Sequence, residues 1–311
     1  MKLGFSLCQY LCPLVTCMLF SFLSFLSLNI ATSFEIPAYV GRFGSPFVNG
    51  SIPGTFFENR TMPMRVTLES TTTIGHSRVP LGNVHVHTRS GDFGLADGEI
   101  YFHGGIGPES TLAIGRNSFV RNLFGPVAFT QNELVLNSNR TEFVSTCVDG
   151  SYMAIAINGD IPDQFSGSIH AEGMIVDANF RLGGSTAGII GAFPREIGER
   201  IISQMIANGA VLERRRSRRG ISESVMTNCS AESTFAGLPD VTLNFTQSGA
   251  LVLTPEDYIQ VDYLHRECLL RFVDPAPASV GGYFVFNPLH ISHLNVRVSD
   301  DLLEICDDST A

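Results

Sequence analysis

The chain lacks tryptophan, contains a single lysine, Lys2, and carries few charged residues, 16% of the total. Its 30 acidic residues exceed its 20 lysines and arginines, which gives a formal net charge of −10. A protein of this charge does not present the basic surface that nucleic acids attract, so no nucleic-acid partner is expected. Because 44% of the 311 residues are hydrophobic, the chain is not of the disordered class and can bury a core.

Long apolar runs are absent from the body of the chain, but residues 11–31 form one. The small residues in Ala31-Thr32-Ser33 predict cleavage there, so residues 1–33 are expected to be a signal peptide. An uncleaved signal anchor is the alternative, because the run is long enough to cross a bilayer. A membrane partner is expected only in that case.

Sequons for N-glycosylation occur at Asn49, Asn59, Asn139, Asn228 and Asn244. With the leader, they predict a glycoprotein that is secreted or held in a lumenal compartment of the secretory pathway. Such compartments are oxidising. The four cysteines of the body therefore suit two disulfides, with three possible pairings.

Short alternating apolar runs separated by turn residues predict a mostly β fold. The expected strands are residues 64–68, 84–87, 99–102, 152–157, 241–245, 250–253, 283–286 and 294–298. One helix is expected to begin near Pro194 and to stop near Asn208-Gly209. Its apolar face is predicted to carry Ile197, Ile201, Met205 and Ile206.

An arginine-rich run, Arg214–Arg219, follows this helix. Five arginines within six positions cannot be buried without an equal set of acids, so an exposed loop is predicted. The alternative interpretation is a cleavage site for a processing protease that recognises basic residues.

A series of segments resembles, in order, the landmarks of a pepsin-like aspartic peptidase, chiefly of its second lobe. They are residues 99–106, 152–159 and 174–177, the helix after Pro194, Cys229, residues 238–245 and 253–259, Cys268, and residues 296–305. The resemblance implies a mostly β, pepsin-like architecture with a fairly complete C-terminal lobe, residues 99–311, and a reduced N-terminal lobe, residues 34–98. It also implies a Cys229–Cys268 disulfide, which leaves Cys147 and Cys306 to pair or to stay free.

Catalysis in this family needs two carboxylates that share one proton, each in an Asp-Thr-Gly or Asp-Ser-Gly tripeptide. Neither tripeptide occurs in the chain. By resemblance, Asp177 takes the second catalytic position, although Ala178-Asn179 follows it. A second alignment, counted back from Pro194, puts residues 185–187 at the tripeptide and leaves no aspartate there.

The remaining landmarks of the active site also depart from the family pattern. An apolar strand that ends in glycine crosses beneath the family's active-site loop, and here Phe286 replaces that glycine. In the first lobe, Asp92 and Asp97 lie among glycines, which is typical of turns. No residue of this lobe is therefore assigned to the first catalytic position.

The sequence predicts a relative of aspartic peptidases that has lost catalysis and binds a peptide or protein ligand in a cleft, without a cofactor. The alternatives are an active aspartic endopeptidase with drifted motifs and an incomplete gene model of one. No metal site is assigned, because His85 with His87, and His290 with His293, supply only two ligands each.

Overall fold

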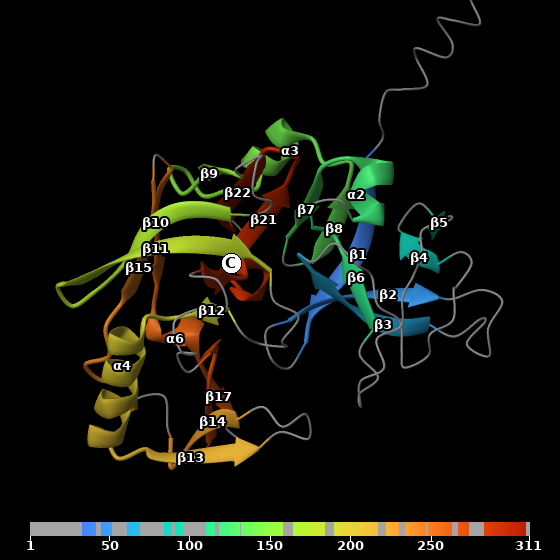
Figure 1. Cartoon of the computed structure of the whole chain (residues 1–311). Helices are drawn as coiled ribbons and strands as arrows, with labels where there is room; N and C mark the ends of the chain where they lie inside the picture. Colours follow the sequence, from blue (N-terminus) through green and yellow to red (C-terminus); the bar gives the residue numbers. More distant parts are fainter. Residues whose placement is uncertain are drawn as a thin grey trace, which may run out of the picture. The chain divides into compact units, whose positions relative to one another are not determined.

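The computed structural model (Figure 1) describes residues 33–41, 45–51, 61–68, 84–88, 91–95, 110–115, 118–130, 132–157, 164–183, 190–216, 222–229, 234–246, 248–262, 267–273 and 283–308. Contacts group the chain into Met1–Ser33 and a second unit, Phe34–Ala311, to which the description below applies. The strand predicted at residues 99–102 lies outside the described residues. Within them, no helix has the length and hydropathy needed to cross a membrane.

Strands dominate the described part of the chain, as the alternating sequence pattern predicts. Those of the first half are β1 (Phe34–Val40), β2 (Pro46–Ser51), β3 (Thr61–Thr67), β4 (Val84–Thr88), β5 (Gly91–Leu95), β6 (Ser110–Ala113), β7 (Val127–Phe129), β8 (Glu133–Leu136) and β9 (Met153–Ala156). Those of the second half are β10 (Gln164–Ala171), β11 (Met174–Leu182), β12 (Gly191–Ala192), β13 (Val211–Arg216), β14 (Ser222–Thr227), β15 (Val241–Phe245), β16 (Gly249–Leu253), β17 (Ile259–Asp262), β18 (Glu267–Leu270), β19 (Phe272–Val273), β20 (Tyr283–Phe286), β21 (Leu294–Val298) and β22 (Leu302–Asp307).

The helices among the described residues are α2 (Phe119–Phe124), α3 (Arg140–Ser145), α4 (Arg195–Ala207) and α6 (Pro255–Tyr258), with a 3-10 turn, η1, at Pro288–His290. Helix α4 is the one that the sequence predicted, and Pro194 is its N-cap. Ile197, Ile201 and Met205 are buried. Ile206 is 48% exposed, so its predicted place on the apolar face was wrong. It follows Met205 directly, and consecutive helical residues point in directions about 100° apart.

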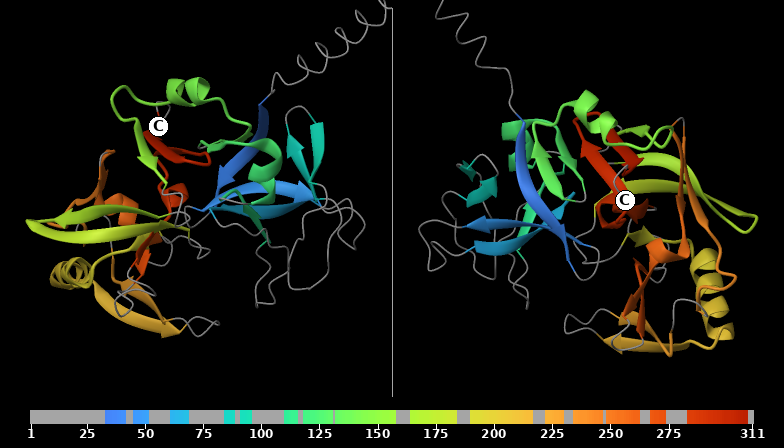
Figure 2. Two further views of the ribbon diagram at one scale, coloured as in Figure 1. Left: turned by 45° about the horizontal axis from the view of Figure 1, so that its top comes forward. Right: turned by 180° about the vertical axis from the view of Figure 1, so that it is seen from behind.

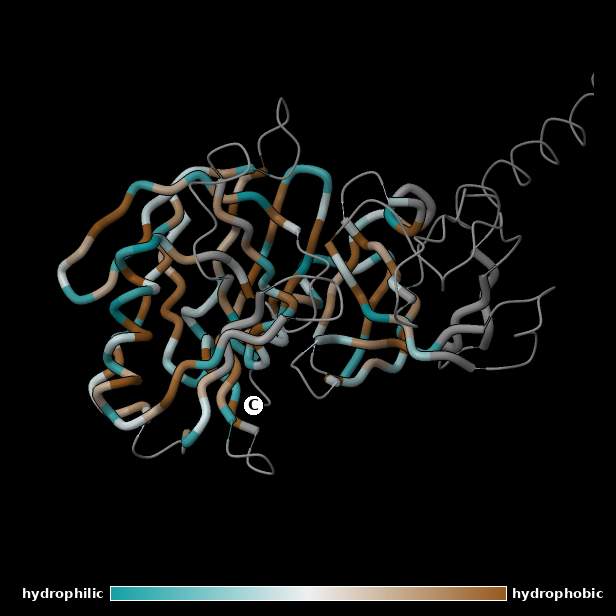
Figure 3. Tube along the Cα trace, turned by 60° about the horizontal axis from the view of Figure 1, so that its bottom comes forward, coloured by the Kyte–Doolittle hydropathy of each residue, from teal (hydrophilic) through white to brown (hydrophobic). Residues whose placement is uncertain are grey.

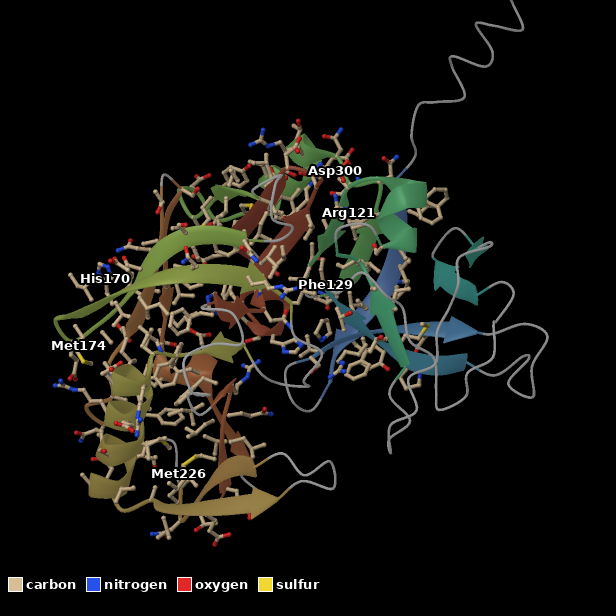
Figure 4. The ribbon with its side chains drawn as sticks, viewed as in Figure 1. Arg121, Phe129, His170, Met174, Met226 and Asp300 are labelled. Atoms are coloured by element: carbon tan, nitrogen blue, oxygen red, sulfur yellow. A yellow bond between two sulfur atoms is a disulfide. The ribbon has the colours of Figure 1, made fainter. Side chains whose placement is uncertain are left out.

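The largest sheet has eleven strands and joins the two ends of the described chain. Its order is β5-β4-β2-β1-β8-β7-β21-β22-β9, with β3 on β2 and β6 on β3. Arg121 of α2 forms an ion pair with Asp300, in the turn between β21 and β22, and Figure 4 labels both residues. The boundary predicted at residues 98 and 99 falls inside this sheet, because β6 pairs with β3.

A second sheet has seven strands in the order β16-β15-β10-β11-β20-β12-β19. Its β10 and β11 form the long curved hairpin seen in Figures 1 and 2. The hairpin turns at Glu172 and Gly173, both with positive φ, 44° and 79°. Positive φ at both central residues matches the twist of the flanking strands.

The core of this sheet is aromatic. Phe165, Phe180, Phe245 and Phe286 are buried, and their ring centroids lie 5.3–6.4 Å apart. Beside them, a Cβ atom at Gly167 would lie 2.0 Å from the main-chain oxygen of Asn244, so only glycine fits. Figure 3 shows hydrophobic residues alternating with hydrophilic ones along many strands, which is the pattern of sheets with one buried face.

Two strands break the alternation that the sequence predicted. Residues 64–68, mostly in β3, are all buried, and so are all five residues of β21. Strand β3 lies between β2 and β6, and β21 lies between β7 and β22. Because every position of both runs is buried, neither face of these strands is open to solvent.

The third sheet has the order β13-β14-β18-β17 and corrects the prediction for the arginine-rich run. Residues 214–216 belong to strand β13, not to a loop, while residues 217–219 lie outside the described part. In the register of β13 and β14, Arg215 is opposite Glu223. Strand β13 is the outermost strand of this sheet. Charged residues suit such a strand because they oppose its pairing with a strand of another chain.

Candidate functional site

Asp177, the predicted catalytic residue, lies within β11 and well before the strand ends at Leu182. Its side chain is exposed, and the residue opposite it on β10 is Ser168. Ile175 is 67% exposed, so the apolar residues that precede Asp177 do not form a buried strand. Asp177 therefore lies on the solvent side of the β10–β11 hairpin.

Strand β20 lies between β11 and β12 in the seven-stranded sheet. It pairs in parallel with the end of β11, from Asn179 opposite Tyr283 to Leu182 opposite Phe286. On its other side, Phe286 pairs with Gly191 of β12. Strand β20 therefore separates β11 from β12, although these two strands follow each other in the chain. The segment between them contains residues 185–187, which lie outside the described residues.

A similar arrangement occurs in the first half of the chain, where sequence reasoning placed no such strand. Strand β6 pairs in parallel with β3, with Ala113 opposite Thr67, and the amide of Ile114 donates to the Thr67 carbonyl at 2.8 Å. The apolar run Leu112–Ile114 followed by Gly115 was the available signal. Each half of the chain thus has a later strand lying parallel to the end of an earlier one.

The structure contains both disulfides. Cys229 is bonded to Cys268, which confirms the pairing implied by the family resemblance. Cys147 is bonded to Cys306, which decides the alternative that the sequence left open. Two disulfides are consistent with an oxidising compartment.

Four of the five sequon asparagines are in the described residues. Asn49, Asn139 and Asn228 are exposed, and Asn244 is half-buried; Asn59 lies outside the described part. The amide nitrogen Nδ2 of Asn228 donates to the carbonyl of Gly209 at 3.0 Å. That of Asn244 lies 3.2 Å from the ring Nε2 of His170.

No group of three potential metal ligands occurs among the described residues. The side chains of His85 and His87 lie outside the described part of the structure. His290 is fully buried, while His293 lies in a cavity.

This cavity was not predicted from the sequence. Its volume is about 670 Å³, and it is lined by four stretches of chain that are far apart in sequence: Gly150–Met153, Ser248–Asp257 except Leu253 and Pro255, Ser292–Leu294, and Ile305–Asp308. Strands β9, β16, β21 and β22 and helix α6 contribute to it. No local motif could have revealed it, because long-range strand pairing brings these stretches together.

Asp257 and His293 form the best-defined polar contact in the cavity. Oδ1 of Asp257 lies 3.1 Å from Nδ1 of His293, and its Oδ2 accepts from the Thr254 amide at 2.8 Å. Burial acts to raise the pKa of Asp257, but the hydrogen bonds from His293 and Thr254 outweigh it and lower the pKa. The same contact raises the pKa of His293 against the opposing effect of burial. Asp307 lies 3.6 Å from Nε2 of the same ring.

A buried charge network holds the strands behind the cavity. Glu304 is fully buried and forms an ion pair with Arg297. It also accepts from the Tyr152 hydroxyl at 2.6 Å and lies 2.7 Å from Nε of Arg140. Arg297 in turn donates to the carbonyl of Ser138 at 3.0 Å. The network joins α3, β21 and β22 with Tyr152, the residue before β9.

A scan of the chain against models of known protein families gives no match. A search of curated proteins also gives no match.

Proposed function

We propose that this protein is a secreted relative of pepsin-like aspartic peptidases that binds a peptide or protein ligand and does not cleave it. The observation that carries the proposal is the position of β20 between β11 and β12. It matches the strand that crosses beneath the family's second active-site loop. The chain that follows β11 begins with Gly183-Gly184 and contains no aspartate before Pro194.

This arrangement favours the second of the two alignments, in which residues 185–187 take the place of the tripeptide and the aspartate is missing. Peptide hydrolysis in this family needs one carboxylate as a base and another as an acid. Removing one member of such a pair typically removes most of the rate, because the members act as a unit. An exposed Asp177 within β11 has Ser168, not a carboxylate, opposite it.

The rival function, a drifted but active endopeptidase, predicts acid proteolysis that depends on Asp177. The test uses protein secreted from a eukaryotic host and an unfolded protein substrate between about pH 3 and 5, where a carboxylate pair is half-protonated. We expect no cleavage above the background of a mock preparation. The rival would be correct if cleavage were observed and a statine-type inhibitor blocked it. In that case Asp177→Ala should abolish the cleavage, while Asp149→Ala should leave it intact. Asp149 is a suitable control because it is also exposed.

A further inference from the structure

Two sheets end beside the 670 Å³ cavity. Strand β16 is the last strand of the seven-stranded sheet, and β9 is the last strand on the path of the eleven-stranded one. Within the described residues, β16 pairs only with β15, and β9 pairs only with β22. A Cβ atom at Gly249 would lie 4.0 Å from the Cβ of Met153, so the two strands approach each other at this end of the cavity.

The edge of β16, rather than one of its faces, borders the cavity. Ser248 to Val252 are five consecutive residues, and all of them line it. Side chains alternate between the two faces of a strand, so one face could supply only every second residue. In an antiparallel pair, alternate residues direct their N–H and C=O groups away from the partner strand. These groups of β16 are therefore directed toward the cavity.

The charge of the lining is strongly one-sided. Glu256, Asp257, Asp307 and Asp308 contribute carboxylates, and among the described residues of the lining only His293 can carry a positive charge. Asp257 already binds Thr254 and His293. Glu256 is exposed, and the side chain of Asp307 is 50% exposed, so both can meet a cation that arrives from solvent.

The lining also contains apolar side chains. Met153 and Val252 are among the cavity residues; Met153 is partly exposed, and Val252 is 47% exposed. A lysine or arginine side chain fits such a mixed surface, because its aliphatic stem packs on apolar atoms while its charged end pairs with carboxylates. A free inorganic cation would use only the carboxylates.

We propose that an extended peptide segment carrying lysine or arginine binds along β16 as an added strand, with its basic side chains in the cavity. Strand addition supplies affinity through main-chain hydrogen bonds, and the pocket for alternate side chains supplies selectivity. The site uses no residue of β11, β12 or β20. It therefore stands independently of the proposed loss of catalysis.

The experiment measures fluorescence anisotropy of a labelled octapeptide of alternating arginine and valine, titrated with the complete secreted protein. Two further peptides separate the two parts of the proposal: one replaces every arginine by glutamate, and one is N-methylated at alternate main-chain nitrogens. We expect the first peptide to bind with a dissociation constant below about 100 µM, which weakens as salt is raised. The other two are expected not to bind in that range. Absence of binding by the arginine peptide, or equal binding by either of the others, would overturn the proposal.

Protein variants locate the site. The double variant Glu256→Gln, Asp307→Asn should weaken binding by about tenfold or more, because it removes two carboxylates at the cavity without changing side-chain size. Glu196→Gln is the matched control, since Glu196 and Glu256 are both exposed acids in the first turn of a helix. Circular dichroism checks that each variant is folded. An equal loss of affinity in the control, or none in the double variant, would mean that the peptide binds elsewhere.

Discussion

Nδ1 of His293 lies 3.1 Å from Oδ1 of Asp257, and this contact connects the chain before β21 to helix α6. The histidine has its pKa raised by this contact, and the aspartate has its pKa lowered. The two residues are 36 positions apart in sequence, which is far beyond the reach of local structure. The contact thus belongs to the tertiary fold, and its contribution to stability depends on pH.

The pH dependence of this contact follows from the raised pKa of His293 and the lowered pKa of Asp257. A raised histidine pKa stabilises the fold below the unfolded value of about 6.5, and the effect is lost as pH rises through the folded value. A lowered aspartate pKa stabilises it above the unfolded value of about 3.9, and the effect is lost as pH falls through the folded value. The pair therefore contributes most between about pH 4 and 6.5.

The variant His293→Gln should lower the free energy of unfolding by about 0.5–1 kcal/mol at pH 5.5, a value reduced because the histidine is partly exposed. The difference should shrink at pH 8.5, because the stabilisation from a raised histidine pKa is lost as pH rises through the folded value. Urea denaturation at both pH values measures it. A difference that is the same at both would show that the effect comes from packing and not from charge.

Removing the buried carboxylate of Glu304 should be costly. The variant Glu304→Ala leaves Arg297, which is 6% exposed, without its charge partner. Breaking a buried ion pair from one side costs about 3–5 kcal/mol. Tyr152→Phe removes only the hydroxyl that donates to the same carboxylate and should cost about 1 kcal/mol. Chemical denaturation of both variants tests this order, and equal losses would contradict it.

The close approach at Gly167 predicts that any side chain there strains the β10–β15 pairing. In Gly167→Ala, the new Cβ would meet the main-chain oxygen of Asn244, which cannot move without shifting β15. We expect a loss of about 1–3 kcal/mol. Ser166→Ala, at the exposed neighbouring position, should change stability by about 0.5 kcal/mol or less. A Gly167→Ala variant as stable as this control would contradict the geometry.

Peptide mapping without reduction should recover two cross-linked pairs, Cys229 with Cys268 and Cys147 with Cys306. The second bridge closes the larger loop, with a sequence separation of 159 against 39. In the chain-entropy model, its removal by Cys147→Ser, Cys306→Ser should cost about 5 kcal/mol, against about 4 kcal/mol for the smaller loop. Recovery of free thiols at these positions in most molecules would contradict the pairing.

Sequence patterns predicted local elements well and tertiary features poorly. The strands at Val241–Phe245, Tyr283–Phe286 and Leu294–Val298 have the bounds that the sequence indicated, because apolar runs and flanking turn residues are local signals. Burial within β21 was mispredicted because it depends on what packs against the two faces of the strand in the folded chain. The run at Arg214 was taken as a loop because its charge was weighed without its pairing to β14.

Sequence patterns also did not predict the cavity, because its residues are far apart in the chain. Met153, Val252, His293 and Asp307 come from strands and turns that meet only after the sheets have formed. Asp177 was assigned from the three apolar residues before it, but Ile175 is exposed. An apolar run near a hairpin turn does not reveal which of its residues face solvent.

The exposed sequons predict where sugar is attached. Asn139 lies at the N-cap of α3, and only its Oδ1 is used there, accepting from the Thr141 amide at 2.8 Å. Its Nδ2, the atom that carries an N-glycan, is on an exposed side chain. Asn244 lies on β15, between β10 and β16, and its Nδ2 contacts His170. A glycan on Asn244 would have to displace this contact in the middle of a sheet.

We therefore expect an amidase that removes N-glycans to lower the apparent mass of protein secreted from a eukaryotic host. The variant Asn139→Gln should reduce that shift by one glycan, whereas Asn244→Gln should leave it unchanged. Mass spectrometry of the deglycosylated peptides measures occupancy directly, because the amidase converts each glycosylated asparagine to aspartate. An unchanged band for the wild-type chain would contradict passage through the secretory pathway. Full occupancy of Asn244 would instead mean that the sugar is added before β15 pairs with its neighbours.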